Sequence, residues 1–222
     1  MPWTDEQLAE RIAQDIEPGW IINLGIGIPT LVAGYLHTPG VLVHAENGIL
    51  GVGPRPAPGR EDPDIIDPGK NPATVVPGAA FMDSLTSFGL IRGGHLDLAV
   101  VGAYQVSAGG DLANWRLPDR RVGGIGGAAD LAAGARRIWV AMRYRAKDGS
   151  SKLVSECTYP LTAKGVVSRI YADLCVLHIL PEGVQLVELA PGVEEEELRG
   201  ITGVPLLARS PREPSVDVSR SS

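Results

Sequence analysis

The sequence predicts an α/β fold on three observations. Short apolar runs that fit buried strands alternate along the chain with stretches of helical periodicity. The run at residues 20–24 leads into a loop containing Gly25 and Gly27, and residues 30–35 then fit a helix. This order of strand, glycine loop and helix is the layout of an anion-binding site. The chain of 222 residues also fits one large α/β domain.

The helices and strands can be placed along the chain from composition and periodicity. An amphipathic helix is expected at residues 4–16, because apolar residues recur every four positions and Thr4 with Gln7 fits a capping box. Further helices are expected at 30–35, 81–88, 128–135 and 193–201. Strands are expected at 20–24, 41–43, 73–76, 96–101 and 137–142. Residues 51–70 and 103–115 are expected to be long loops. Loops as long as 51–70 are usually functional or disordered, and we favour a functional role for this one.

One domain followed by a short tail is the expected organisation. Neither an internal repeat nor a linker interrupts residues 1–208, which we expect to fold as a unit. Residues 209–222 are rich in Ser, Pro and Arg, a composition typical of disordered chain ends. We therefore predict a domain at 1–208 and a disordered tail at 209–222.

Composition argues against several classes of function. A net charge of −6 and an aromatic content of 5% disfavour nucleic-acid binding. No apolar run approaches the roughly 18 residues of a membrane-spanning helix, and the polar N-terminus does not resemble a signal peptide. Cys157 and Cys175 have no metal-ligand spacing with the histidines, so no metal site is expected. We expect both as reduced thiols in a cytoplasmic protein, with a disulfide as the alternative.

The strongest candidate for chemistry is Glu46. An apolar run at 41–43 leads into it, and Asn47, Gly48 and two more glycines follow. Ligands of open α/β sheets bind just beyond the carboxyl ends of strands, where glycines allow close approach. A carboxylate without a metal motif or a Ser–His pair can act as a general base or as a nucleophile. On local pattern alone, a solvated glutamate before an Asn-Gly turn remains equally open.

A nucleotide or sugar-phosphate site at the first glycine loop is less favoured. The dinucleotide fingerprint requires a third glycine where Thr30 stands. A phosphate loop of a sugar-phosphate isomerase would carry basic residues, and residues 25–30 contain none. The two glycines then serve a tight turn between strand and helix.

Residues 46–54, Glu-Asn-Gly-Ile-Leu-Gly-Val-Gly-Pro, resemble the active-site motif of family I CoA-transferases, in the β subunit of the 3-oxoacid type. Further blocks that resemble the family's signatures, in its order and at nearly its spacing, lie at 23–30, 91–95, 110–115, 126–128 and 160–162. The segments most similar to 3-oxoadipate CoA-transferases lie at 157–162, 168–174 and 202–206.

The resemblance implies a fold and a mechanism. The fold would be Rossmann-like, with a mostly parallel central sheet flanked by helices. Glu46 would attack an acyl-CoA such as succinyl-CoA, carry a glutamyl-CoA thioester, and pass CoA to 3-oxoadipate or acetoacetate by a ping-pong mechanism. The Gly127 N–H would stabilise the oxyanion. Residues implied in substrate or CoA binding are Asn23, Gly25, Gly27, Asn47, Gly48 and Lys70.

The resemblance also implies partners. An α subunit of similar size would complete an α2β2 heterotetramer, with CoA as a substrate carrier and no permanently bound cofactor. The loops at 51–70 and 103–115 would exclude water, which otherwise hydrolyses a thioester. Arg143 and Arg145 depart from the family pattern, and if they face the site they would favour an acceptor with an additional carboxylate.

Three other functions remain as alternatives. A CoA-ester hydrolase of the same fold would use the glutamate to activate water and would need no acceptor acid. An acetate- or butyrate-type CoA-transferase would share the mechanism but differ in substrates. A non-catalytic subunit is disfavoured, because Glu46 is retained within an intact motif.

Overall fold

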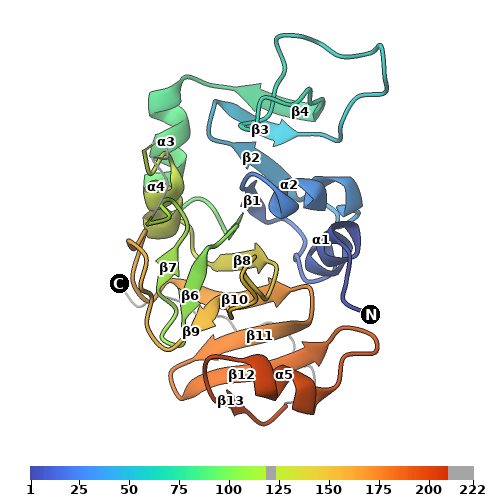
Figure 1. Cartoon of the computed structure of the whole chain (residues 1–222). Helices are drawn as coiled ribbons and strands as arrows, with labels where there is room; N and C mark the ends of the chain where they lie inside the picture. Colours follow the sequence, from blue (N-terminus) through green and yellow to red (C-terminus); the bar gives the residue numbers. More distant parts are fainter. Residues whose placement is uncertain (119–123, 210–222) are drawn as a thin grey trace.

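The computed structural model describes residues 1–118 and 124–209, and its main feature there is a mixed ten-stranded sheet (Figure 1). The order across this sheet is β13 (Leu206–Leu207), β12 (Gly183–Leu189), β11 (Cys175–Leu180), β10 (Val167–Ala172), β8 (Ile138–Met142), β5 (Leu98–Val101), β1 (Ile21–Leu24), β2 (Leu42–Ala45), β3 (Ile49–Val52) and β4 (Val75–Phe81). The α/β fold expected from the sequence is confirmed.

The centre of the sheet is parallel. β2, β1, β5, β8 and β10 pair in parallel, whereas β3 and β4 at one end and β11 and β12 towards the other pair antiparallel. Parallel strands that are covered on both faces carry near-continuous apolar runs. All four residues of β5 and all five of β8 are buried accordingly. The carboxyl ends of the central strands meet at one edge, the usual place for a ligand.

Helices cover both faces of the central strands (Figure 1). α1 (Asp5–Ala13), α2 (Ile28–Leu31) and the 3₁₀ turn η1 (Val32–Tyr35) lie on one side, and α3 (Ser84–Arg92) and α4 (Ala128–Gly134) on the other. Leu98 and Val100 of β5 pack in the apolar cluster of α1. Ala99 and Val101 pack in the cluster of α3 and α4, as the alternation of side chains along a strand requires.

Most expected boundaries agree with the structure to within two residues, and the capping box of α1 is present. The helix expected at 81–88 is misplaced. β4 continues to Phe81, and α3 begins only after Asp83, whose side chain accepts a hydrogen bond from Thr86 N (2.9 Å). The expected strand at 73–76 is correspondingly too short. The full length of β4 could not be predicted from the sequence, because Pro77 and Gly78 inside it are normally strand breakers.

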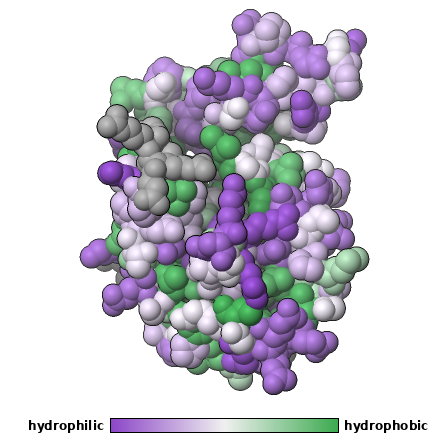
Figure 2. Space-filling view, in the orientation of Figure 1, coloured by the Kyte–Doolittle hydropathy of each residue, from purple (hydrophilic) through white to green (hydrophobic). Residues whose placement is uncertain are grey.

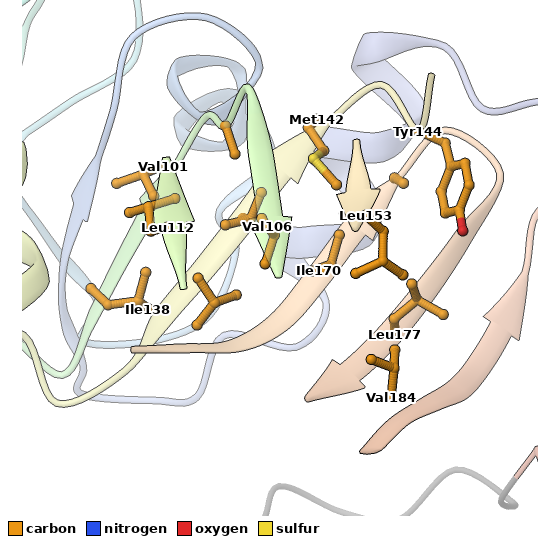
Figure 3. Close-up of a cluster of buried hydrophobic side chains, with 14 of the residues drawn as sticks. Val101, Val106, Leu112, Ile138, Met142, Tyr144, Leu153, Ile170, Leu177 and Val184 are labelled. Atoms are coloured by element: carbon orange, nitrogen blue, oxygen red, sulfur yellow. The ribbon is translucent and has the colours of Figure 1, made fainter. Parts of the chain in front are cut away.

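A second, three-stranded sheet corrects the loop expected at 103–115. Its strands are β7 (Leu112–Ala113), β6 (Gln105–Ser107) and β9 (Leu153–Val154). Strands of two or three residues show no periodicity, and the pairing partner β9 is distant in sequence. In Figure 3, Val106, Leu112 and Leu153 of this sheet lie over Ile138 and Ile170 of the large sheet, within one buried cluster.

The loop expected at 51–70 is shifted by the strands on either side. β3 continues to Val52, which pairs with Val75 of β4, so the loop runs between these two residues. It extends at the top of Figure 1. Asn47 Nδ2 donates to Ile66 O (2.8 Å), which ties this loop to the turn between β2 and β3.

The remaining expectations concern thiols, membranes and the tail. Cys157 and Cys175 are both free thiols, so the alternative of a disulfide is wrong. Within 1–118 and 124–209, none of the helices has the length and apolarity needed to cross a membrane. The face in Figure 2 mixes hydrophilic with apolar residues. Of the expected tail, Arg209 is described and residues 210–222 lie outside the described residues.

Candidate active site

Glu46 lies in the tight turn that joins β2 to β3. Gly48 N donates to Ala45 O (3.0 Å), and Met82 N donates to Gly48 O (2.9 Å). Gly48 has φ +119°, and a Cβ there would lie 2.3 Å from Met82 O. Both the backbone conformation and the space therefore require glycine. The turn presents the Glu46 side chain, which is half-buried, at the carboxyl end of a central strand.

Asn23 of β1 holds the Glu46 carboxylate. Its side chain is buried, with 1% exposed, and Nδ2 donates to Glu46 Oε2 (3.2 Å) and to His44 O (3.0 Å). β1 and β2 are parallel neighbours in which Asn23 pairs with His44, so the sheet register creates this contact. Asn23 thus lies next to the candidate nucleophile, as expected. A neutral amide donor orients the carboxylate and leaves its charge in place.

His44 and Ser87 form a second layer behind the carboxylate. His44 Nε2 lies 3.0 Å from Ser87 Oγ, and Ser87 Oγ donates to the backbone oxygen of Glu46 (2.9 Å). Because the single hydroxyl proton of Ser87 goes to Glu46, His44 Nε2 is the donor of the first bond. Burial lowers the pKa of His44, partly opposed by the charge of Glu46, so the imidazole is neutral at pH 7.

Neither His44 nor Ser87 was predicted from the sequence as a residue of the site. His44 carried a usable signal, because an imidazole in a buried strand requires hydrogen-bond partners and His44 stands two positions before Glu46. Ser87 carried none, because it reaches the turn from α3, 41 residues later in the chain.

Gly127 lies directly beside Glu46. It is the N-cap of α4, and a Cβ built on it would lie 3.7 Å from Glu46 Cγ and 3.5 Å from the ring of Phe88. Glycine thus leaves the backbone uncovered next to the carboxylate. The free N–H groups at the start of a helix are suited to stabilising an oxyanion.

The two positions after β1, 25 and 27, favour glycine for different structural reasons. Gly25 N donates to Val100 O (2.8 Å), and a Cβ on Gly25 would lie 3.2 Å from the same oxygen, so close strand packing requires it. Gly27 has φ +97° and forms the N-cap of α2. Thr30 Oγ1 donates to Gly25 O (2.9 Å) and closes this turn.

Lys70 and the two arginines after β8 are not joined to Glu46 by a hydrogen bond or an ion pair within the described part of the chain. Lys70 is exposed in the long loop with φ +64°. Arg143 pairs with Asp5 (2.6 Å) and with Asp173 (3.7 Å), so its charge is engaged at the start of α1. Arg145 is exposed. The sequence left the orientation of Arg143 open, and the structure directs its charge to Asp5 and Asp173.

A pocket of about 400 Å³ lies next to the turn. Its walls come from the end of β1, α2, the strands β2 and β3, and the long loop; they include Gly27, Thr30, His44, Ala45, Arg55 and Asp67. Most of the lining is apolar, and Arg55 is its cationic member. A cavity of this size can enclose part of a small organic substrate. In the part of the chain that is described, no group of three His, Cys, Asp or Glu could hold a metal.

The chain is similar over most of its length to proteins of one family. The family model described as Coenzyme A transferase matches residues 5–212. The B subunit of the 3-oxoadipate CoA-transferase of Pseudomonas putida is 52% identical over 202 residues, or 90% of this chain and 95% of that protein. The B subunit of the succinyl-CoA:3-ketoacid coenzyme A transferase of Helicobacter pylori is 45% identical over 194 residues, or 87% and 94%.

A solved structure shows the same fold. It is an acyl-CoA transferase from Escherichia coli O157:H7 in a thioester complex with CoA, with a TM-score of 0.72 and 18% identity. The match covers 95% of this chain and 42% of that chain, so this chain spans less than half of that protein.

Proposed function

Because this chain belongs to the coenzyme A transferase family, we propose that it is the β subunit of an enzyme that moves CoA from succinyl-CoA to a 3-oxoacid. The observation that carries this proposal is the setting of Glu46. Its carboxylate is oriented by Asn23, lies beside the uncovered backbone of Gly127, and stands at the carboxyl end of a central strand. Such a carboxylate is suited to nucleophilic attack on an activated acyl group.

The proposed reaction exchanges one thioester for another. A Glu46 oxygen attacks the thioester carbonyl and the C–S bond breaks. CoA departs as the thiolate, and a mixed acyl–glutamyl anhydride is formed. The thiolate attacks the glutamyl carbonyl, which releases succinate and leaves a glutamyl-CoA thioester. A second acid repeats these steps in reverse, and Glu46 is regenerated. No ATP is required, because the thioester energy is conserved.

The surrounding residues have separable proposed roles. Asn23 Nδ2 orients the attacking carboxylate, and the Gly127 N–H stabilises the oxyanion that forms on the glutamyl or acyl carbonyl. Lys70 would neutralise a substrate carboxylate when the long loop closes on bound substrate. Gly27 forms part of the pocket wall for CoA, and Gly25 shapes the turn that leads to it. Asn47 with Gly48 fixes the turn that carries Glu46.

The acceptor we favour is 3-oxoadipate, with acetoacetate as the second candidate. The similarity to the Pseudomonas putida 3-oxoadipate enzyme, at 52%, exceeds that to the Helicobacter pylori 3-ketoacid enzyme, at 45%. Arg55 gives the pocket beside the turn a cation for a second carboxylate.

A partner subunit is part of this proposal. Both of these relatives are named as B subunits, and by analogy we propose an α subunit and an α2β2 assembly in the cytoplasm. Large apolar side chains are exposed near the site: Phe81, at the end of β4, is 63% exposed, and Leu85, at the start of α3, is 81% exposed. Large apolar side chains that are exposed to water are typical of a surface that binds a partner protein. CoA enters as a substrate, without a permanently bound cofactor.

The test is an exchange assay on the co-purified complex with succinyl-CoA and a panel of acids: 3-oxoadipate, acetoacetate, acetate and butyrate. We expect acyl-CoA products only when an acid is present, with parallel double-reciprocal plots. Glu46→Gln should abolish exchange, and the exposed Glu182→Gln should not. Consumption of succinyl-CoA without any acid would favour the hydrolase, and a preference for acetate or butyrate would correct the substrate class.

A further inference from the structure

Ser87 is a fully buried hydroxyl with two partners at the candidate nucleophile. Its side chain is 0% exposed on α3, and Oγ lies between His44 Nε2 (3.0 Å) and Glu46 O (2.9 Å). A buried polar group is retained only where its hydrogen bonds are made, since leaving its partners unpaired is costly. Here both partners belong to the strand end and turn that carry the nucleophile.

Glu46 is therefore held at two points. Asn23 holds the side chain through Oε2, and Ser87 holds the backbone through the carbonyl oxygen. The hydrogen bond to the backbone oxygen fixes the orientation of the Glu46 peptide group, and the bond to Oε2 fixes the side chain. If either hydrogen bond is removed, the corresponding part of Glu46 can rotate more freely.

α3 also forms the wall behind the oxyanion donor. The Phe88 ring, next to Ser87 in sequence, lies 3.5 Å from a Cβ built on Gly127. Arg92 at the end of α3 pairs with Asp130 of α4 (2.7 Å). One helix thus contacts both the nucleophile and the group proposed to stabilise its transition state, which makes it the element that sets their separation.

The turn itself does not depend on Ser87 for its fold. The ladder between β2 and β3, the Gly48 N–Ala45 O bond and the Met82 N–Gly48 O bond are all made by backbone atoms and do not involve the hydroxyl. Loss of the hydroxyl would consequently loosen Glu46 within an intact hairpin.

We propose that Ser87, supported by His44, is a positioning residue that holds the Glu46 backbone so that the carboxylate meets the acyl carbonyl in a reactive geometry. This inference rests on the proposed function and adds a residue to it. Misplacement of a reacting group by about 1 Å can cost on the order of 100-fold in rate. We therefore expect Ser87→Ala to lower kcat about 10- to 100-fold and to leave KM for succinyl-CoA within about 2-fold.

The experiment measures thioester formation in a single turnover, by rapid quench and intact mass spectrometry of the complex. Ser87→Ala should form the adduct about 10- to 100-fold more slowly but to the same final extent. Ser84→Ala, an exposed serine of the same helix, is the matched control and should match wild type. A purely structural role of Ser87 would instead lower the amount of active complex without changing the rate.

Two further variants keep the test decisive. Ser87→Cys keeps the shape of the side chain but replaces the hydroxyl with a weak hydrogen-bonding group. It decides the question if Ser87→Ala fails to assemble, and we expect slower formation of the adduct there too. His44→Gln retains a donor near the Nε2 position and should keep most of the rate, whereas His44→Leu should not. Wild-type rates in Ser87→Ala or Ser87→Cys would overturn this inference alone. The absence of any adduct in wild type would overturn the proposed function.

Discussion

Two polar clusters join helices to the same sheet and are built from opposite kinds of side chain. The hairpin cluster, Asn23, His44, Glu46 and Ser87, surrounds one carboxylate with neutral groups. The α1 cluster surrounds its carboxylates with guanidinium groups; its members are Arg11, Asp15, Arg169, Tyr171, His178 and Glu188.

In the α1 cluster every charge meets an opposite one. Arg11 pairs with Asp15 (2.9 Å) and with Glu188 (2.8 Å). Asp15 also pairs with Arg169 (2.7 Å) and accepts from the Tyr171 hydroxyl (2.8 Å). Burial alone would raise the pKa of Asp15, but the hydrogen bonds and charges of these partners outweigh it and lower the pKa. The carboxylate is fully engaged, which suits an anchor between α1 and the strands β10 and β12.

In the hairpin cluster no cation pairs with Glu46 among the described residues. Asn23 donates one neutral hydrogen bond, and His44 is kept neutral because burial lowers its pKa. Ion pairs hold groups in place and quench their charge, whereas neutral donors orient a charge and leave it available. On this difference we assign Asp15 a structural role, and the neutral surroundings of Glu46 support the chemical role proposed for it.

Breaking the α1 cluster should give the largest change in stability. Asp15→Ala leaves Arg11 short of one partner and Arg169 without its carboxylate. Loss of one partner from a buried ion pair costs about 3–5 kcal/mol. We expect the free energy of unfolding of the purified complex, from urea denaturation, to fall by this amount, while kcat per folded enzyme is unchanged.

The control for this variant is Glu10→Ala, an exposed position of the same helix, which should change stability by less than about 0.5 kcal/mol. A stable Asp15→Ala variant with impaired exchange would reverse the assignment of the two clusters.

The stability of the α1 cluster should also depend on pH through His178. Burial, together with the charge of Arg169, lowers the pKa of His178 from 6.5 to about 4. Arg169 Nε donates to His178 Nε2, which must be unprotonated to accept. Because the unfolded chain binds this proton more tightly, the contribution of His178 is complete above pH 6.5 and is lost as the pH falls towards 4.

Between these pH values the loss is on the order of 3 kcal/mol. His178→Gln should remove most of this slope, and His37→Gln, at an exposed position, should retain it. His44 contributes in the same direction in all three proteins, so the difference between them isolates His178. Denaturation at a series of pH values measures this, and equal slopes in wild type and His178→Gln would show that His178 does not titrate as described.

The smallest of the three effects is expected at Asn23. Removing a hydrogen bond to a charged group costs about 2 kcal/mol, which corresponds to about 30-fold in rate. Asn23→Ala should lower kcat by this factor and destabilise the complex less than Asp15→Ala does. A large loss of stability with normal kcat would place Asn23 with the structural cluster instead.

How far the sequence predicted this arrangement depends on the range of the interactions. The capping box of α1, the strand before Glu46 and the glycine turn are local patterns, and they were predicted. The pairing of β6 with β9 and the contact of Ser87 with Glu46 join distant segments, so no local pattern records them. The orientation of Arg143 could not be predicted either, because its ion-pair partner Asp5 lies far away in the sequence.

The most direct measurement of the proposed role of Glu46 is intact mass spectrometry of the complex after incubation with succinyl-CoA and an acid quench. We expect this chain to gain the mass of CoA less one water, located by peptide mapping to the segment that contains Glu46. The adduct should be absent in Glu46→Gln and present in Asp15→Ala. An adduct that persists in Glu46→Gln, or exchange activity without any adduct on this chain, would contradict the assignment of Glu46 as the nucleophile.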